Sequence, residues 1–193
     1  MRRWVFLLIL LLIPGFFLIW HLRSKADQGV YGTDMIYVLD EEGNARVTMV
    51  DKVYFTTPAV EKNFEETLSR PVAVQDLELR IKEMVQKLAR EAGVSDWAVD
   101  GFSGYRKKEV GFGGRYVSFT WKNFARRQGN QLVVDFRFAQ KIRMNEHSSL
   151  VIVPPAGLKI IRLEPVADSK GQDRLVWQGP KEIAWPYLVL ARP

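Results

Sequence analysis

The chain contains no cysteine among its 193 residues. It therefore has no disulfide framework, no thiolate zinc site, no cysteine nucleophile and no lipidated cysteine anchor. Histidine is nearly as scarce, because only His21 and His147 occur, and this count excludes a histidine-rich metal site. With 47% hydrophobic and 26% charged residues, the composition excludes a wholly disordered chain and suits one globular domain.

Motifs that carry a specific chemistry are also missing. The glycine cluster Gly111–Arg115 lies between two predicted strands, whereas a phosphate-binding loop must follow a strand and begin a helix. The acidic turn Asp40–Gly43 lacks the alternating ligands and the closing glutamate of a calcium loop. His147 stands in the polar segment Asn145–Ser149, which has no nucleophile-elbow pattern around its serines. We therefore assign no catalytic, cofactor-binding or metal-binding residue, and we expect no cofactor and no enzyme activity.

A long apolar run near the amino terminus is the clearest feature that the sequence does contain. Residues Trp4 to Trp20 carry no charged side chain, and basic residues stand on both sides of them. The helical distance from Arg3 to Arg23 is about 30 Å, which matches the hydrocarbon core of a bilayer. We predict an N-terminal transmembrane helix that contacts lipid through residues 4–22. Its expected membrane-interface residues are Arg2, Arg3, Trp4, Trp20, Arg23 and Lys25.

The alternative to this anchor is a cleaved signal peptide, because Ser24-Lys25-Ala26 loosely matches a small-x-small cleavage site. The apolar run is longer than the usual signal-peptide core of roughly 7 to 15 residues, and this length favours an uncleaved anchor. The basic flanks are nearly balanced and do not set the orientation alone. Since an N-terminal anchor usually keeps its short end inside, we predict a single-pass cell-membrane protein. Its N-terminus would be cytoplasmic and its C-terminal domain extracytoplasmic.

The formal net charge of +6 is mostly a property of the predicted anchor. Without the four flanking cations the chain holds 24 basic and 22 acidic residues, too small an excess for a nucleic-acid footprint. Residues 27–102 hold 8 basic and 15 acidic residues, whereas residues 103–143 hold 10 basic and 2 acidic ones. This basic stretch suggests a face for an anionic envelope component, an acidic protein or a second copy of the chain. Its candidate residues are Arg106, Lys107, Lys108, Arg115, Arg126 and Arg127. The alternative is that these cations are solvated ends of strands whose aromatic residues face the core.

Residue periodicity predicts the elements that follow the anchor. Asp34–Leu39 and Arg46–Phe55 flank a polar turn and indicate a β-hairpin. Thr57 and the proline after it indicate the start of a short helix. A long amphipathic helix is expected from about Gln75 to Ala92, with apolar residues at three- and four-residue steps. The segments after Gly93 are typical of strands: Trp97–Tyr105, Tyr116–Trp121, Gln131–Phe138, Leu150–Val153, Leu158–Leu163, Leu175–Gln178 and Tyr187–Leu190.

These elements predict an α+β fold. We expect an antiparallel β-rich domain with a β-hairpin, a short helix and one long amphipathic helix packed on the sheet. The predicted organisation is a membrane anchor with basic flanks at residues 1–25, a linker at 26–33 and an extracytoplasmic α+β domain at 34–193.

The apolar N-terminus and the hairpin turn at Asp40–Gly43 carry one resemblance, together with the runs Leu150–Pro155 and Leu175–Gly179. These features resemble uncharacterised single-anchor extracytoplasmic proteins of thermophilic prokaryotes, a domain-of-unknown-function family. The resemblance implies no activity. We therefore expect a membrane-anchored interaction or binding module of the cell envelope. The alternative is an envelope hydrolase with a carboxylate-based site, for which the sequence favours no particular pair of carboxylates.

Overall fold

The described part of the chain is built mainly from β-strands. A computed structural model describes residues 29–171 and 173–192. Its largest sheet has seven strands, in the order β10 (Ser169–Lys170), β11 (Leu175–Gln178), β8 (Ser149–Val153), β1 (Val30–Leu39), β2 (Ala45–Tyr54), β4 (Phe112–Lys122) and β3 (Ala98–Lys108). A four-stranded sheet has the order β5 (Arg126–Gln128), β6 (Gln131–Val134), β13 (Tyr187–Ala191) and β9 (Lys159–Glu164). The short strands β7 (Ile142–Met144) and β12 (Lys181–Ile183) pair with each other.

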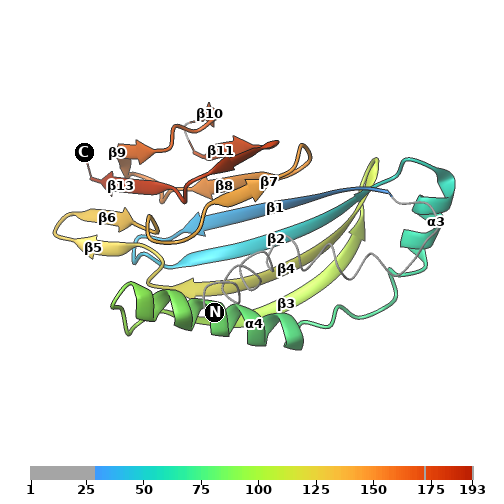
Figure 1. Cartoon of the computed structure of the whole chain (residues 1–193), viewed down its shortest axis with the longest axis horizontal. Helices are drawn as coiled ribbons and strands as arrows, with labels where there is room; N and C mark the ends of the chain where they lie inside the picture. Colours follow the sequence, from blue (N-terminus) through green and yellow to red (C-terminus); the bar gives the residue numbers. More distant parts are fainter. Residues whose placement is uncertain (1–28, 172, 193) are drawn as a thin grey trace, which may run out of the picture.

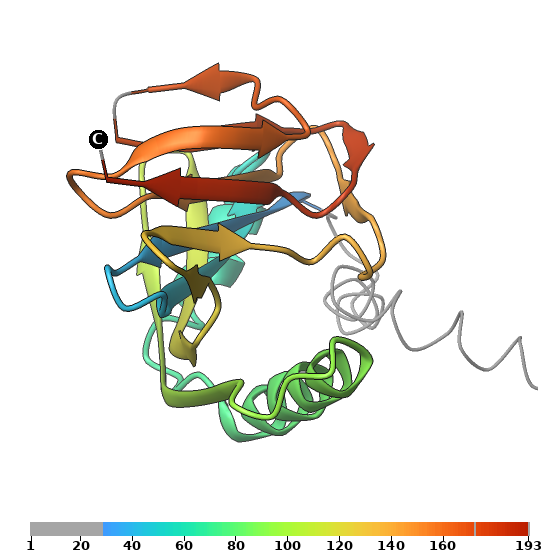
Figure 2. The same cartoon turned by 90° about the vertical axis from the view of Figure 1, so that its left-hand side faces the viewer.

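The four-stranded sheet and the helices lie on the same side of the large sheet (Figures 1 and 2). The four-stranded sheet covers one end of the long strands, and helix α4 (Gln75–Glu91) runs beside the edge strand β3. Helix α3 (Pro58–Glu65) lies at the other end, where the ring of Phe64 packs directly over Gly113 of β4. The core therefore lies between two sheets, and α4 closes its side.

Local sequence signals explain the two long hairpins. In the β1–β2 turn, Asp40 accepts hydrogen bonds from the backbone N–H and the side-chain amide of Asn44, at 2.8 and 2.9 Å. Gly43 has a φ of 93°, which glycine adopts without strain. The β3–β4 turn uses Gly111 in the same way, with a φ of 82°. The β1–β2 and β2–β4 ladders are continuous and antiparallel, whereas the β3–β4 ladder shifts its register between Asp100 and Ser103.

One connection in the large sheet is not antiparallel. Strand β8 pairs in parallel with β1, and Ser149 lies beside Asp34 in this register. The Ser149 hydroxyl donates a hydrogen bond of 2.7 Å to the Asp34 carboxylate, which also forms an ion pair of 2.9 Å with Lys52 of β2. A segment far along the chain therefore completes the sheet on the free side of β1.

The two helices begin and bury residues as their sequences indicate. Thr57 caps α3, since its side chain accepts a hydrogen bond of 3.4 Å from the backbone N–H of Val60. Helix α4 buries Ile81, Val85 and Leu88 along one face. These side chains join a single core cluster whose largest wholly buried members are Trp121, Trp177, Phe124 and Phe136. No polar or charged residue is buried in the described part of the chain, so apolar side chains fill this core.

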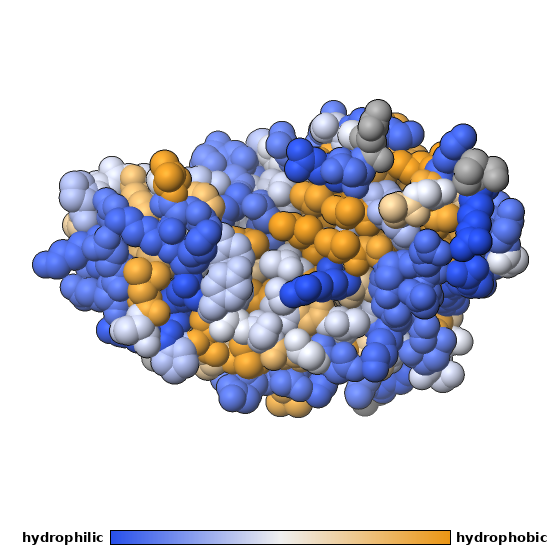
Figure 3. Space-filling model, turned by 180° about the vertical axis from the view of Figure 1, so that it is seen from behind, coloured by the Kyte–Doolittle hydropathy of each residue, from blue (hydrophilic) through white to orange (hydrophobic). Residues whose placement is uncertain are grey.

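The opposite face of the large sheet carries no second layer of described residues. Strand alternation places Ser, Thr and charged side chains on this face, as is usual for a solvated antiparallel sheet. Figure 3 looks onto it and shows an apolar patch among polar side chains. On β1, β8 and β11 the apolar residues of this face are Ile36, Val38, Val151, Val153 and Val176.

The predicted α+β class is wrong. The layer expected to be one long amphipathic helix packed on the sheet is mainly a second sheet, and α4 contacts chiefly the edge strand β3. None of the helices in residues 29–171 and 173–192 is long and apolar enough to cross a membrane. The transmembrane helix predicted at Trp4–Trp20 lies outside the described residues.

Most predicted strands form, with two kinds of difference. The hairpin, the start of α3 and the strands from Leu150 onward are confirmed. The strand predicted for Gln131–Phe138 ends at Val134, and the chain then leaves the sheet. Short strands such as β5, β7, β10 and β12 are too brief to show a period in the sequence.

The turn at Gly43 offers a test of how the layers meet. A Cβ at Gly43 would lie 2.2 Å from the carbonyl oxygen of Ala125, whose N–H donates a 2.7 Å hydrogen bond to the Gly43 carbonyl. A Cβ at Gly111 would meet nothing within 4 Å, although its φ is also positive. We therefore expect Gly43→Ala to lower the free energy of unfolding by about 2 kcal/mol more than Gly111→Ala, measured by urea denaturation. Equal losses would show that the Gly43–Ala125 approach is unimportant.

Candidate functional site

The structure separates the six predicted basic residues into two groups. Arg106, Lys107 and Lys108 end β3, and Arg115 of β4 lies beside Arg106 in the register. Arg126 and Arg127 form most of β5, in the other sheet, beyond the opposite end of β4. The six cations therefore do not make one continuous face.

Carboxylates and a backbone carbonyl group contact the first group, which consists of Arg106, Lys107, Lys108 and Arg115. Lys108 contacts the carboxylates of Glu61 and Glu65, each at 2.5 Å, and these hydrogen bonds raise the pKa of the lysine. The Arg106 guanidinium donates to the backbone carbonyl oxygen of Arg70 at 2.7 Å. Arg115 pairs with Asp51 and Lys107 with Glu109. The acidic and basic stretches of the sequence thus meet within one chain.

Arg126 has a different environment. Its guanidinium carbon lies 5.2 Å from the ring centroid of Trp97, close enough for a cation–π contact. Within the described residues its side chain has neither a hydrogen-bond acceptor nor an ion-pair partner. The adjacent Arg127 instead donates a hydrogen bond of 2.7 Å to the carbonyl oxygen of Glu41.

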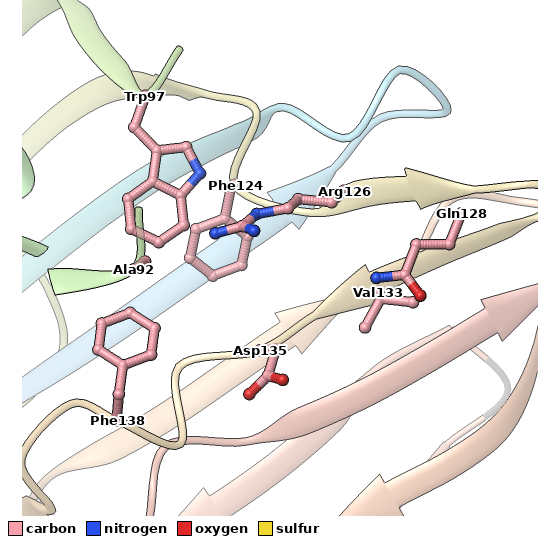
Figure 4. Close-up of a pocket in the computed structure, with 8 residues that line it drawn as sticks. All are labelled: Ala92, Trp97, Phe124, Arg126, Gln128, Val133, Asp135 and Phe138. Atoms are coloured by element: carbon pink, nitrogen blue, oxygen red, sulfur yellow. The ribbon is translucent and has the colours of Figure 1, made fainter. Parts of the chain in front are cut away.

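Arg126 lies at a hollow of about 180 Å³ that we name the Trp97 hollow. Its walls come from the residue after α4, the segment before β3, the link between β4 and β5, the β5–β6 hairpin and the loop after β6. Figure 4 shows the guanidinium of Arg126 pointing from β5 toward Trp97, with Phe138 and Asp135 on the opposite side. The lining residues are Ala92, Trp97, Phe124, Arg126, Gln128, Val133, Asp135 and Phe138.

Trp97 is held rigidly at the inner wall. Its indole N–H donates a hydrogen bond of 2.7 Å to the carbonyl oxygen of Asn123. Its ring stacks on Phe136 at 5.1 Å and meets Trp121 edge-on at 5.9 Å. Phe138 stacks more loosely, at 6.3 Å, and is 42% exposed at the mouth. The hollow thus has a fixed aromatic wall and one accessible aromatic side chain.

The carboxylate of Asp135 is already engaged. Arg137 binds it through two hydrogen bonds, at 2.9 and 2.7 Å, and its guanidinium carbon lies 4.0 Å from the ring centroid of Tyr187. These hydrogen bonds from Arg137 hold the pKa of Asp135 below its ordinary value. Asp135 is therefore ionised at neutral pH, and Arg137 balances its charge.

This arrangement is suited to binding. Aromatic walls with a few polar groups at the rim are typical of ligand sites. No cluster of three or more His, Asp or Glu side chains that could hold a metal occurs in the described part of the chain. His147 lies in a loop, as expected, and its imidazole contacts the adjacent Glu146 at 3.0 Å. The predicted membrane-interface residues Arg2, Arg3, Trp4, Trp20, Arg23 and Lys25 lie outside the described residues.

Sequence reasoning selected Arg126 but missed the residues around it. Trp97 and Phe138 were expected to be ordinary strand residues, and Gln128 and Asp135 were not candidates. Phe138 gives no separate signal, because it continues the alternation of Leu132, Val134 and Phe136. No local sequence pattern indicates that Trp97 lies beside Arg126, because the two residues come together only in the folded chain.

The fold defines a mostly β domain of two packed sheets. The chain belongs to a family described as a domain of unknown function (DUF7345), whose family model matches residues 37–158. This range contains every lining residue of the Trp97 hollow. The match confirms the expected membership of a family of unknown function and carries no information about a thermophilic source or an anchor.

Other comparisons add little. No curated protein matches the chain. Among solved structures, the NMR structure of the folded domain of Mycobacterium tuberculosis LppM is similar, with a TM-score of 0.43 and 12% sequence identity. The similarity covers 88% of this chain and 95% of that one.

Titration tests the state of the Asp135 carboxylate. Because its pKa is lowered in the folded protein, the Arg137 pair stabilises the fold above the unfolded pKa of about 4 and loses this effect as the pH falls. We expect Arg137→Gln to raise the pKa of Asp135 toward its ordinary value, measured by carboxyl ¹³C NMR. Arg162→Gln, which removes another cation near Tyr187, is the control and leaves this pKa nearly unchanged. An unmoved Asp135 pKa in Arg137→Gln would show that Arg137 does not neutralise the carboxylate.

Proposed function

We propose that the chain is a binding module of the cell envelope and that the Trp97 hollow holds its ligand. The observation that carries the proposal is the rigid aromatic wall at Trp97 with the guanidinium of Arg126 beside it, which has no hydrogen-bond or ion-pair partner among the described residues. A site that is rigid before binding loses little conformational entropy when a ligand enters.

The volume of the hollow limits the size of the ligand group that can enter it. A cavity of roughly 150 Å³ can hold benzene, so about 180 Å³ accommodates one six-membered ring. Phe138 at the mouth and Val133 on the wall supply apolar contact, and the Gln128 amide supplies a donor and an acceptor. The ligand part that enters is therefore a single ring or a group of similar size.

The alternative hydrolase needs two carboxylates that face one another across a substrate. The Trp97 hollow contains one carboxylate, Asp135, and Arg137 binds both of its oxygens. A second hollow, of about 220 Å³, lies behind Trp97 between α4 and β3 and is lined without any carboxylate. These observations favour the binding module.

The envelope location is supported by the sequence. The apolar run Trp4–Trp20 with basic flanks is typical of a segment that directs a chain to the export machinery. We expect external protease to cleave the domain in intact cells or spheroplasts. A cytoplasmic protein tested in the same sample should stay intact until lysis. A domain protected until lysis would contradict the proposed location.

A neutral ring probe tests the proposed site. We expect 4-fluorobenzyl alcohol to bind the full chain with a Kd on the order of 1 mM, measured by ¹⁹F NMR line broadening. Phe138→Ser should weaken this binding about fivefold, because it removes an apolar wall. Ile161→Ser is the matched control, since Ile161 is 60% exposed on β9 and does not line the hollow. If the two variants bind the alcohol with equal affinity, the Trp97 hollow is not its binding site.

A further inference from the structure

The charges around the Trp97 hollow restrict the chemistry of its ligand. Two charged side chains, Arg126 and Asp135, line the hollow, and Arg137 binds Asp135 from outside the lining. Arg137 and Asp135 balance each other through two hydrogen bonds. The remaining charge is the single positive charge of Arg126. A ligand with one negative charge would neutralise this part of the surface.

The guanidinium of Arg126 is prepared for such a ligand. It lies over Trp97, and the indole ring is itself held by Asn123, Phe136 and Trp121. A cation–π contact at 5.2 Å from the ring centroid uses none of the guanidinium N–H groups as hydrogen-bond donors, so they stay available to a ligand. Side-chain freedom that binding normally removes is thus already restricted.

Donor geometry favours a carboxylate over other anions. The planar fork of arginine matches the two oxygens of a carboxylate, as the Arg137–Asp135 pair in the loop after β6 shows. A phosphate monoester carries about 1.5 to 2 negative charges at neutral pH, more than the single charge available here. The apolar walls accept one ring next to the anionic group.

From these observations we infer that the Trp97 hollow binds a carboxylate attached to a six-membered ring or a group of similar size. This inference rests on the proposed function and names the chemistry of its ligand. The ring contacts Phe138 and Val133, and the carboxylate accepts hydrogen bonds from Arg126. Gln128, at the rim, adds a hydrogen bond to a polar substituent.

The negative charge of a ligand adds only a modest gain in affinity. Arg126 is an exposed side chain, and exposed ion pairs add only modest affinity, which salt reduces. We expect 4-fluorobenzoate to bind the full chain about five- to tenfold more tightly than 4-fluorobenzyl alcohol at low ionic strength, measured by ¹⁹F NMR. The cation 4-fluorobenzylamine should bind more weakly than the alcohol.

Substitutions at two adjacent positions of β5 show which residue causes the preference for benzoate over the alcohol. Arg126→Gln should abolish the preference for benzoate and leave a measurable affinity for the alcohol. Arg126→Lys should retain part of the preference, since it keeps the charge and loses the planar fork. Arg127→Gln is the matched control and should leave the preference unchanged, because Arg127 points to Glu41 and does not line the hollow.

The outcomes separate this inference from the proposed function. If the alcohol binds in a Phe138-dependent way but benzoate binds no more tightly, the carboxylate inference is wrong and the binding site stands. If Arg127→Gln abolishes the preference as fully as Arg126→Gln, the inference is also wrong. If neither probe binds, both the inference and the proposed function are wrong.

Discussion

Aromatic packing around Phe136 is the interaction on which the rest of the structure depends. The Phe136 ring is wholly buried and lies 5.0 Å from Phe124, 5.1 Å from Trp97, and 5.4 Å from both Trp121 and Trp185. These rings come from the large sheet, from the link between the sheets and from the segments before β3 and β13. Since the described core contains no buried polar residue, this contact of rings joins the layers.

The same packing also supports the candidate site. Trp97 has neighbours from the core on its inner side, and Arg126 contacts it from the hollow. Elsewhere the basic and acidic segments of the sequence form ion pairs with each other. Cations of β3 and β4 pair with carboxylates of α3 and β2. Arg126 lies outside this pairing, so the fold leaves one cation beside one rigid aromatic wall.

Sequence reasoning predicted features whose signal is local. The helix near Gln75–Ala92, the Thr57 cap and the first hairpin follow from periodicity and turn chemistry, and all three form. The fold class was wrong because no local pattern indicates whether a helix or a second sheet covers a given face. Phe138 continues the alternation of the strand before it, yet the chain has already left the sheet at that point. The site was predicted only in part, through Arg126, because its walls come from distant segments.

The parallel pairing of β1 with β8 has a consequence for the order in which the chain can fold as it is synthesised. β1 is the first described strand to emerge, and β2 covers one of its edges at once. Its other edge waits for β8, and the Asp34–Ser149 hydrogen bond across it joins residues 115 positions apart. Until then β1 presents unpaired backbone groups, which are a template for pairing between chains. A fragment that stops before Ser149 would retain this open edge permanently, so loss of residues 149–193 turns an internal strand into an aggregation-prone border.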